Sequence, residues 1–218
     1  KTGRPPEYDL EEPRRVAEAI KTLNLRYAVI TSVDRDDLQD GGASIFAETV
    51  RRTHEACPGI RLEVLIPDFR GSISALRTVA EARPEVVAHN VETVPRLYPV
   101  ARAGSRYRRS LDHLRNAKSF GIEIRTKSSI MLGLGEERSE VLEVLNDLRA
   151  AGVDIVTLGQ YLQPTREHLP VERYYTPAEF DEFRDYARSL GFMYVASGPL
   201  VRSSYRAEKA MQGDEASN

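Results

Sequence analysis

Polar side chains gather where the short apolar runs of this sequence end. Thr31, Ser32 and Asp34 follow one such run, and Asn90 and Glu92 close another. Hydroxyls, amides and carboxylates are the groups that fix the orientation of a small polar ligand. On a strand, Asn90 and Glu92 would project from the same face, which favours recognition of ligand hydroxyl groups. Residues of these types also cap helices and bind loop amides.

Three further polar features have roles that depend on their burial and on their partners: Lys127, His89 and the basic stretch 102–109. Lys127 lies within an apolar run, where a buried ammonium needs a carboxylate or a ligand as its partner. His89 is interpreted as a buried, hydrogen-bonded residue rather than a ligand. The basic stretch is either a solvated surface or a docking patch for an acidic partner. Its arginines are Arg102, Arg106, Arg108 and Arg109.

The apolar runs alternate with helical patterns along the chain. Their length and β-branched content are typical of buried parallel strands. These predicted strands are 27–31, 61–66, 86–91, 123–130, 155–159 and 192–196. Helices are predicted from Pro13, with Val16, Ile20 and Leu23 on one face, over 42–56, 72–82 and 109–120, around 141–152, and from Thr176. The alternation predicts an α/β fold, a partial parallel β/α barrel of about six units whose site lies at the carboxyl ends of the strands.

Composition narrows the class of protein. The 218 residues carry a net charge of −2 and are 41% hydrophobic, so we expect one globular domain over 1–210 and a disordered tail at 211–218. The charge balance gives no reason to expect nucleic acid or a membrane as partner, and no apolar run approaches the ~20 residues of a transmembrane helix. Cys57, the single cysteine, excludes an internal disulfide. We interpret it as structural, and it favours the cytoplasm or an organellar matrix.

Motifs in the same order along the chain resemble those of the lipoyl synthase family. They are 27–42, 66–71, 89–96, 126–128 with 133–136, 158–164 and 198–205. That family belongs to the radical S-adenosylmethionine enzymes. The resemblance implies a partial β/α barrel and two [4Fe-4S] clusters. One cluster would cleave S-adenosylmethionine to a 5′-deoxyadenosyl radical, and the other would be consumed as the sulfur donor.

The implied reaction inserts two sulfur atoms, at C6 and C8 of an octanoyl chain attached to a protein lysine. The implied partners are octanoylated lipoyl-carrier domains or the glycine-cleavage H protein, with an electron donor such as flavodoxin or ferredoxin. By the same resemblance, no catalytic residue is assigned with certainty. The implied S-adenosylmethionine pocket draws on Thr31, Ser32, Asp34, Asn90, Glu92, Lys127 and Gln160.

The resemblance also implies one iron ligand in this sequence, Ser204, with Ser203 as the alternative. A hard alkoxide is an unusual ligand for an iron–sulfur cluster and would leave readily when that cluster gives up sulfur. The cysteine motif of the family's radical cluster, C-x3-C-x2-C, precedes the segment that corresponds to 1–5, and the sequence does not contain it. We therefore expect a chain truncated at its N-terminus that holds neither cluster and is inactive alone.

Two other functions remain open on the residues alone. One is a cluster-free β/α-barrel lyase with Lys127 as its Schiff-base residue. The other is a non-catalytic domain that binds S-adenosylmethionine. Borohydride trapping with carbonyl substrates would identify the lyase, and the sequence upstream of Lys1 would distinguish the binding domain from a truncated enzyme.

Overall fold

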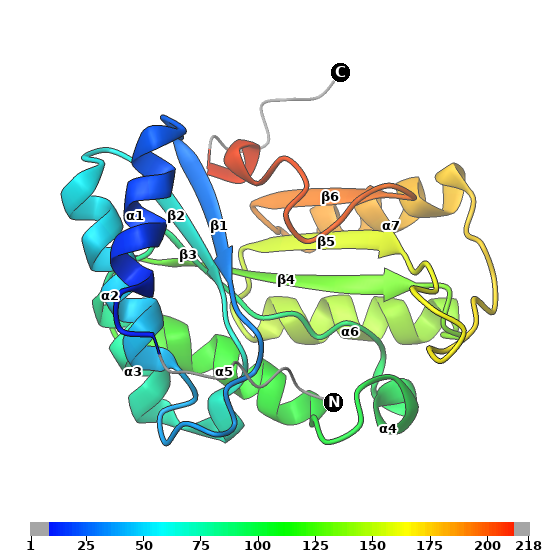
Figure 1. The fold of residues 1–218 in the computed structure, drawn as a ribbon. Helices are drawn as coiled ribbons and strands as arrows, with labels where there is room; N and C mark the ends of the chain where they lie inside the picture. The colour runs from blue at the N-terminus through cyan, green and yellow to red at the C-terminus, as the bar shows by residue number, and fades with distance from the viewer. Residues whose placement is uncertain (1–8, 212–218) are drawn as a thin grey trace. The chain divides into compact units, whose positions relative to one another are not determined.

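The computed structural model describes residues 9–211. The expected tail at 211–218 lies outside the described residues except for Met211, which ends η3 (Ala207–Met211). The strands, in chain order, are β1 (Tyr27–Thr31), β2 (Arg61–Leu65), β3 (Val86–Ala88), β4 (Arg125–Leu132), β5 (Ile155–Gln160) and β6 (Tyr194–Gly198). Within each half of this series, β1 to β3 and β4 to β6, the strands lie side by side in chain order (Figure 1). The predicted α/β class with parallel strands is confirmed, and each predicted strand is present with its ends shifted by at most a few residues.

The chain divides into two compact units, and each is described by itself. Unit 1 comprises Lys1–His89 and Asn116–Arg125. Its strands β1, β2 and β3 pair in parallel. Helices α1 (Glu12–Thr22), α2 (Ala43–Ala56) and α3 (Ile73–Glu81), with the short η1 (Phe69–Gly71), belong to this unit (Figure 1). The core under the helices contains Ala28, Ile30, Leu62, Val64 and Val87.

The first helix ends one residue earlier than its apolar pattern predicts. Val16 and Ile20 pack on the core of unit 1, as expected. Leu23 does not, because α1 ends at Thr22 and Asn24 turns the chain with a φ of 50°. Leu23 is left 67% exposed, so its assignment to the apolar face was wrong.

Unit 2 comprises Asn90–Arg115 and Thr126–Asn218, with β4, β5 and β6 paired in parallel. Its helical elements are η2 (Pro95–Leu97), α4 (Tyr98–Ala101), most of α5 (Tyr107–Ser119), α6 (Arg138–Ala150), α7 (Pro177–Ser189) and η3. The predicted capping box at Thr176 is confirmed, because its hydroxyl accepts from the Glu179 amide and the Glu179 carboxylate accepts from the Thr176 amide. The one-turn helix α4 has no counterpart among the predicted helices.

Candidate functional site

The strand register of unit 2 places a polar row on the face turned away from its helices. Ser129 of β4 pairs with Thr157 of β5, and the next pair along the two strands is Ile130 with Leu158. Ile130 and Leu158 belong to the core under the helices. Because side chains alternate along a strand, Lys127, Ser129 and Thr157 project from the opposite face. All three are buried, with exposures of 1%, 6% and 1%. The Thr157 hydroxyl has no hydrogen-bond partner among the described residues, so this face carries one polar group that these residues do not satisfy.

Asn90 and Glu92 lie beyond the strand on which they were predicted. β3 ends at Ala88, and Glu92 adopts a φ of 66°, so the same-face argument based on a strand was wrong. The two side chains still meet, because Asn90 Nδ2 donates to Glu92 Oε1 at 3.1 Å. Asn90 is 8% exposed, and its Oδ1 has no partner among the described residues. A buried acceptor of this kind costs free energy until a donor reaches it, so it indicates a place for a ligand.

The Glu92 carboxyl lies in a low-dielectric environment. Burial raises its pKa, while the hydrogen bond from Asn90 and the charge of Arg102 act in the opposite direction. The net effect is a carboxyl that ionises less readily than one in water. Such a group gains most from a ligand that brings a positive charge or a hydrogen-bond donor.

Gln160 contacts the backbone with its whole amide. Its Nε2 donates to the carbonyls of Tyr161 and Arg173, and its Oε1 accepts from the Tyr175 amide at 3.0 Å. Gln160 pairs with Leu132, five residues along β4 from Lys127, so the two side chains point to opposite faces. These contacts give Gln160 a structural role at the end of β5, and its predicted contact with S-adenosylmethionine stays a prediction.

The string Arg202–Tyr205 follows a segment that packs tightly on β5. A Cβ built on Gly159 would overlap the Val201 carbonyl oxygen and lie 3.0 Å from the Val201 carbonyl carbon. Gly159 and Thr157 share the face turned away from the helices, so this face also carries the start of the string. Ser204 is exposed and Ser203 half-buried, which leaves the hydroxyl of the predicted ligand accessible.

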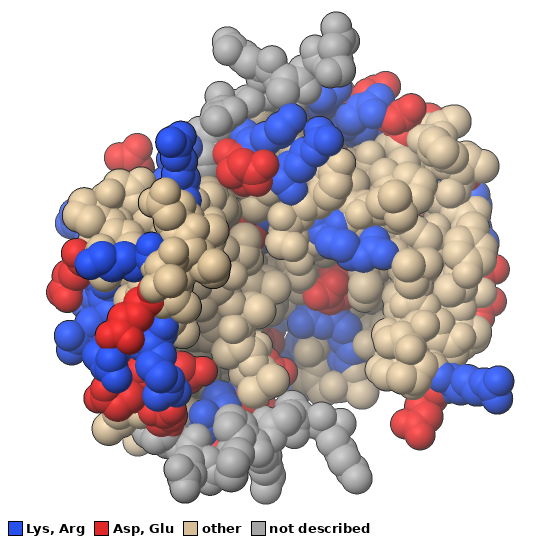
Figure 2. All heavy atoms as spheres, turned by 45° about the horizontal axis from the view of Figure 1, so that its top comes forward, with Lys and Arg blue, Asp and Glu red and all other residues tan. Residues whose placement is uncertain are grey.

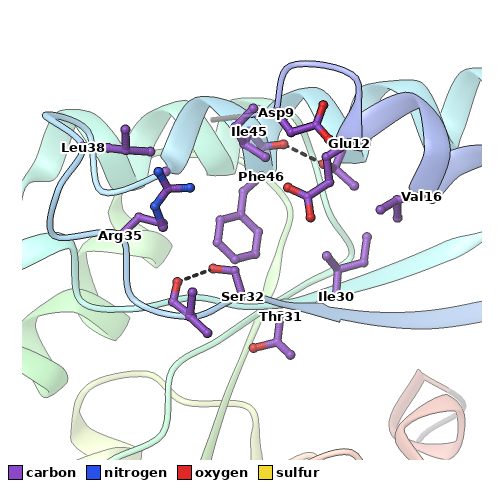
Figure 3. Close-up of a pocket in the computed structure, with 13 residues that line it drawn as sticks. Asp9, Glu12, Val16, Ile30, Thr31, Ser32, Arg35, Leu38, Ile45 and Phe46 are labelled. Carbon is purple, nitrogen blue, oxygen red and sulfur yellow. Dashed lines mark hydrogen bonds between the residues drawn. The ribbon is translucent and has the colours of Figure 1, made fainter. Parts of the chain in front are cut away.

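In unit 1, the residues at the end of β1 and directly after it separate onto different sides of the strand. Figure 3 shows Ile30 and Ser32 directed towards α2, whereas Thr31 points away from it. Thr31 and Ser32 both line a cavity of about 300 Å³, bordered by Arg35, Phe46 and residues of α1. Ser32 Oγ donates to the carbonyl of its neighbour, Val33, at 2.9 Å.

The remaining acidic residues after β1 hold the loop. Arg35 binds the Asp37 carboxylate through two nitrogens, each at 2.8 Å, and Asp36 pairs with Arg70 at 3.1 Å. The Asp40 carboxylate accepts from two amides at the start of α2, so Asp40 serves the turn and the helix start. Asp34 is exposed and does not line the cavity, so its predicted contact with S-adenosylmethionine stays a prediction.

The basic stretch 102–109 is not one surface. Arg102 turns inward, and its Nη1 donates to the Asn90 carbonyl at 2.8 Å. Arg106 and Arg108 are exposed, as a solvated surface predicts. Figure 2 shows Lys and Arg interspersed with Asp and Glu on the face that it presents. His89 is buried, with Nδ1 2.9 Å from the Ile66 carbonyl oxygen, which confirms its interpretation as a hydrogen-bonded residue.

The described residues do not provide the ligands of an iron–sulfur cluster. Cys57 is half-buried and packs against the core of unit 1, as expected for a structural cysteine. Between residues 9 and 211, no three His, Cys, Asp or Glu side chains converge on a point where they could hold a metal ion. Thiolates are the normal ligands of such clusters, so the donor set found in this part of the chain does not fit one.

Comparison with known proteins assigns the family. A family model described as the radical SAM superfamily matches residues 1–148. Lipoyl synthase from Rubrobacter xylanophilus is 55% identical over 208 residues, which are 95% of this chain and 65% of that protein. The chain belongs to the lipoyl synthase family. The lipoyl synthase of Caldicellulosiruptor saccharolyticus is 54% identical over 209 residues, 96% of this chain and 73% of its own length. The chain therefore spans about two thirds of these relatives.

Solved structures agree with this assignment at the level of the fold. Methylornithine synthase (PylB) superposes with a TM-score of 0.60 at 15% identity, over 89% of this chain and 64% of its own. Streptococcus suis SuiB bound to S-adenosylmethionine gives 0.64 at 10% identity, over 94% of this chain and 48% of its own. At these identities, the likeness shows the fold of this lipoyl synthase family member and nothing more. No helix in the described part is long and apolar enough to cross a membrane.

Three residues of the site were not identified from the sequence. Thr157 and Gly159 lie on the polar face of β5, and the alternation of Thr157-Leu158-Gly159 carries a weak signal for this. Tyr98, whose hydroxyl donates to the Val91 carbonyl at 2.7 Å, carries no such signal. A tyrosine within the apolar run Leu97–Ala101 gives no indication of a buried carbonyl partner.

Proposed function

We propose that this chain supplies the β/α part of a lipoyl synthase that inserts two sulfur atoms, at C6 and C8 of a protein-bound octanoyl-lysine. The family assignment supports the reaction class. The observation in the structure that supports it best is the hydrogen-bonded pair Asn90–Glu92, in which the buried Asn90 has an Oδ1 that lacks a partner among the described residues. A polar ligand that brings hydroxyl or ammonium donors completes this pair, and S-adenosylmethionine carries both.

In this proposal, Asn90 Oδ1 accepts a hydrogen bond from a ribose hydroxyl or from the methionyl ammonium. Glu92 contributes the negative charge, and Lys127, on the buried polar face, meets a carboxylate. Thr31, Ser32 and Asp34 are further proposed contacts, and Gln160 shapes the end of β5. Bound S-adenosylmethionine supplies the chemistry that removes hydrogen from an unactivated carbon, while these residues bind and orient it and exclude water.

The [4Fe-4S] clusters are proposed to be held by residues outside this sequence, with Ser204 as the one ligand that this chain adds. We expect the 218-residue chain alone to hold neither cluster and to be inactive. Iron and sulfide analysis after anaerobic reconstitution measures this directly. Two clusters on the isolated chain would contradict the proposal.

The proposed partners are octanoylated lipoyl-carrier domains or the glycine-cleavage H protein, and an electron donor such as flavodoxin or ferredoxin. Nucleic acid and membranes are not among them. The proposed compartment is the cytoplasm or an organellar matrix. Each octanoylated carrier protein is incubated with the full-length enzyme, S-adenosylmethionine and an electron donor. Mass spectrometry then identifies the substrate as the carrier that gains the mass of sulfur.

The test of the site uses Asn90→Ala and Glu92→Gln in the full-length, reconstituted enzyme. Each should weaken S-adenosylmethionine binding by about tenfold or more, because a hydrogen bond to a charged group is worth ~1.5–3 kcal/mol. Asn146→Ala is the matched control, since the Asn146 amide lies on the surface and donates to Leu142 and Tyr186. Unchanged affinity in both site variants would refute the assignment of this pair.

A further inference from the structure

Two side chains, Tyr98 and Arg102, hold the backbone that presents Asn90 and Glu92. Arg102 Nη1 donates to the Asn90 carbonyl at 2.8 Å, and Tyr98 Oη donates to the Val91 carbonyl at 2.7 Å. Arg102 Nη1 also lies 3.2 Å from Tyr98 Oη, and its guanidinium carbon lies 5.5 Å from the centre of the Tyr98 ring. The two side chains therefore support each other, and we call them the Tyr98–Arg102 clamp.

The clamp acts on a segment that would not keep its shape unaided. Glu92 has a φ of 66°, which residues with a Cβ adopt only when their surroundings fix them there. On one side, β4 fixes Glu92, because its amide donates to the Ser129 carbonyl at 3.0 Å and its carbonyl accepts from the Met131 amide at 2.7 Å. On the other side, the clamp fixes the carbonyls of Asn90 and Val91.

We propose that Arg102 and Tyr98 are positioning residues for S-adenosylmethionine: they set the backbone from which Asn90 and Glu92 meet the ligand. This inference rests on the proposed function, because it takes Asn90 and Glu92 as ligand contacts. A rotated peptide at Asn90 or Val91 would turn Asn90 Oδ1 away from its present direction. The clamp therefore contributes to affinity without touching the ligand.

Arg102 has a second effect on the same site. In the described part of unit 2, Asn90, Arg102 and Tyr98 interact with Glu92, and of these three Arg102 carries a charge. Its charge lowers the pKa of Glu92 against the opposing effect of burial. Removing that charge raises the pKa, so the Glu92 carboxylate is lost at a higher pH. Binding of a cationic group by Glu92 then weakens at a higher pH as the solution is acidified.

The experiment measures the equilibrium affinity of the full-length, reconstituted enzyme for S-adenosylmethionine as a function of pH. Arg102→Met should weaken binding by about tenfold and move the acid limb of the profile to higher pH. Arg102→Lys keeps the charge, so it should weaken binding while leaving the limb in place. Tyr98→Phe should weaken binding several-fold, also without moving the limb.

Arg149 provides the matched control. Its Nη1 also donates to a backbone carbonyl, that of Val153, at 3.1 Å, and its guanidinium carbon lies 5.9 Å from the centre of the Phe192 ring. Arg149→Met and Arg149→Lys should change neither the affinity nor the limb. A merely structural arginine would lower stability without changing the affinity of the folded enzyme. Weaker binding in Arg102→Lys and Tyr98→Phe reports positioning, and a moved limb in Arg102→Met reports the charge of Arg102 beside Glu92.

The outcomes separate this inference from the function on which it rests. If the wild-type enzyme does not bind S-adenosylmethionine, the proposed function fails. If it binds and Arg102→Met binds equally well with an unmoved limb, the positioning role fails and the function stands. If Arg102→Met does not fold, Arg102→Lys and Tyr98→Phe decide the matter, and wild-type affinity in both overturns the inference.

Discussion

Replacing Gly159 by Ala should displace the Arg202–Tyr205 string and thereby reduce sulfur insertion. The added Cβ would overlap the Val201 carbonyl oxygen and lie 3.0 Å from the carbonyl carbon, where unstrained carbon contacts need about 3.5–4.0 Å. The carbonyl oxygen overlaps more deeply than the carbon, so the Val201 backbone must retreat by about 1 Å. No φ in the left-handed region is involved at this position, so the effect is steric alone.

The energetic cost follows from the contact. Inserting a methyl group into a close-packed site costs ~1–3 kcal/mol. If the Arg202–Tyr205 string moves to relieve the overlap, the free energy of unfolding falls by less. In that case Ser203 and Ser204 are displaced from their positions. We therefore expect a stability loss of about 1–3 kcal/mol, or a smaller loss accompanied by a large fall in sulfur insertion.

Two assays on the full-length enzyme separate these responses. Denaturant unfolding gives the stability change, and the ratio of sulfur inserted to S-adenosylmethionine cleaved reports the string. Gly198→Ala is the matched control, because Gly198 pairs with Gly159 and its added Cβ would meet only Val201 Cγ2, at an ordinary 3.5 Å. Gly159→Ala with wild-type stability and a wild-type ratio would refute the steric reasoning.

Three further results are expected. Ser204→Ala should impair sulfur insertion more than S-adenosylmethionine cleavage, and equal loss of both would argue against a ligand role. Asp40→Ala should lower the free energy of unfolding by about 1–2 kcal/mol, since the carboxylate accepts from two amides at the start of α2. Burial raises the pKa of Asp40, but the hydrogen bonds outweigh it and the net pKa is lowered. The stabilisation is therefore present above the unfolded pKa of the carboxyl and is lost as the pH falls through the folded pKa, which unfolding curves at two pH values will show. Ser197→Ala removes the hydroxyl that donates to the Phe180 carbonyl at 2.7 Å, and a loss of ~1 kcal/mol in urea is expected; a change below a few tenths would contradict it.

Local patterns predicted most of the fold. The strand at 27–31 and the helix opened by Thr176 follow from β-branched content and from a capping box, which act over a few residues. The early end of β3 has no such local signal, because the positive φ of Glu92 is held by backbone hydrogen bonds to Ser129 and Met131 of β4, far along the chain. Local sequence does not specify those partners.

The sequence predicted which kinds of residue form the candidate site better than it predicted how their side chains are arranged. Asn90 and Glu92 were identified as a pair, and they form one, although the reason was wrong. Gln160 was placed with Lys127, but the register of β4 and β5 puts their side chains on opposite faces, and a register is a property of pairing rather than of either strand. Arg102 was grouped with exposed arginines, because composition does not reveal that the Asn90 carbonyl accepts a hydrogen bond from it.

The unsatisfied oxygen of Asn90 has a thermodynamic consequence for the protein as a whole. A buried acceptor without a donor destabilises the native state by ~1–3 kcal/mol as long as no ligand supplies that donor. A ligand that satisfies it binds the native state and not the unfolded chain, so the melting temperature should rise with ligand concentration. Heat denaturation then becomes a screen for the natural occupant that needs neither turnover nor an assumed reaction.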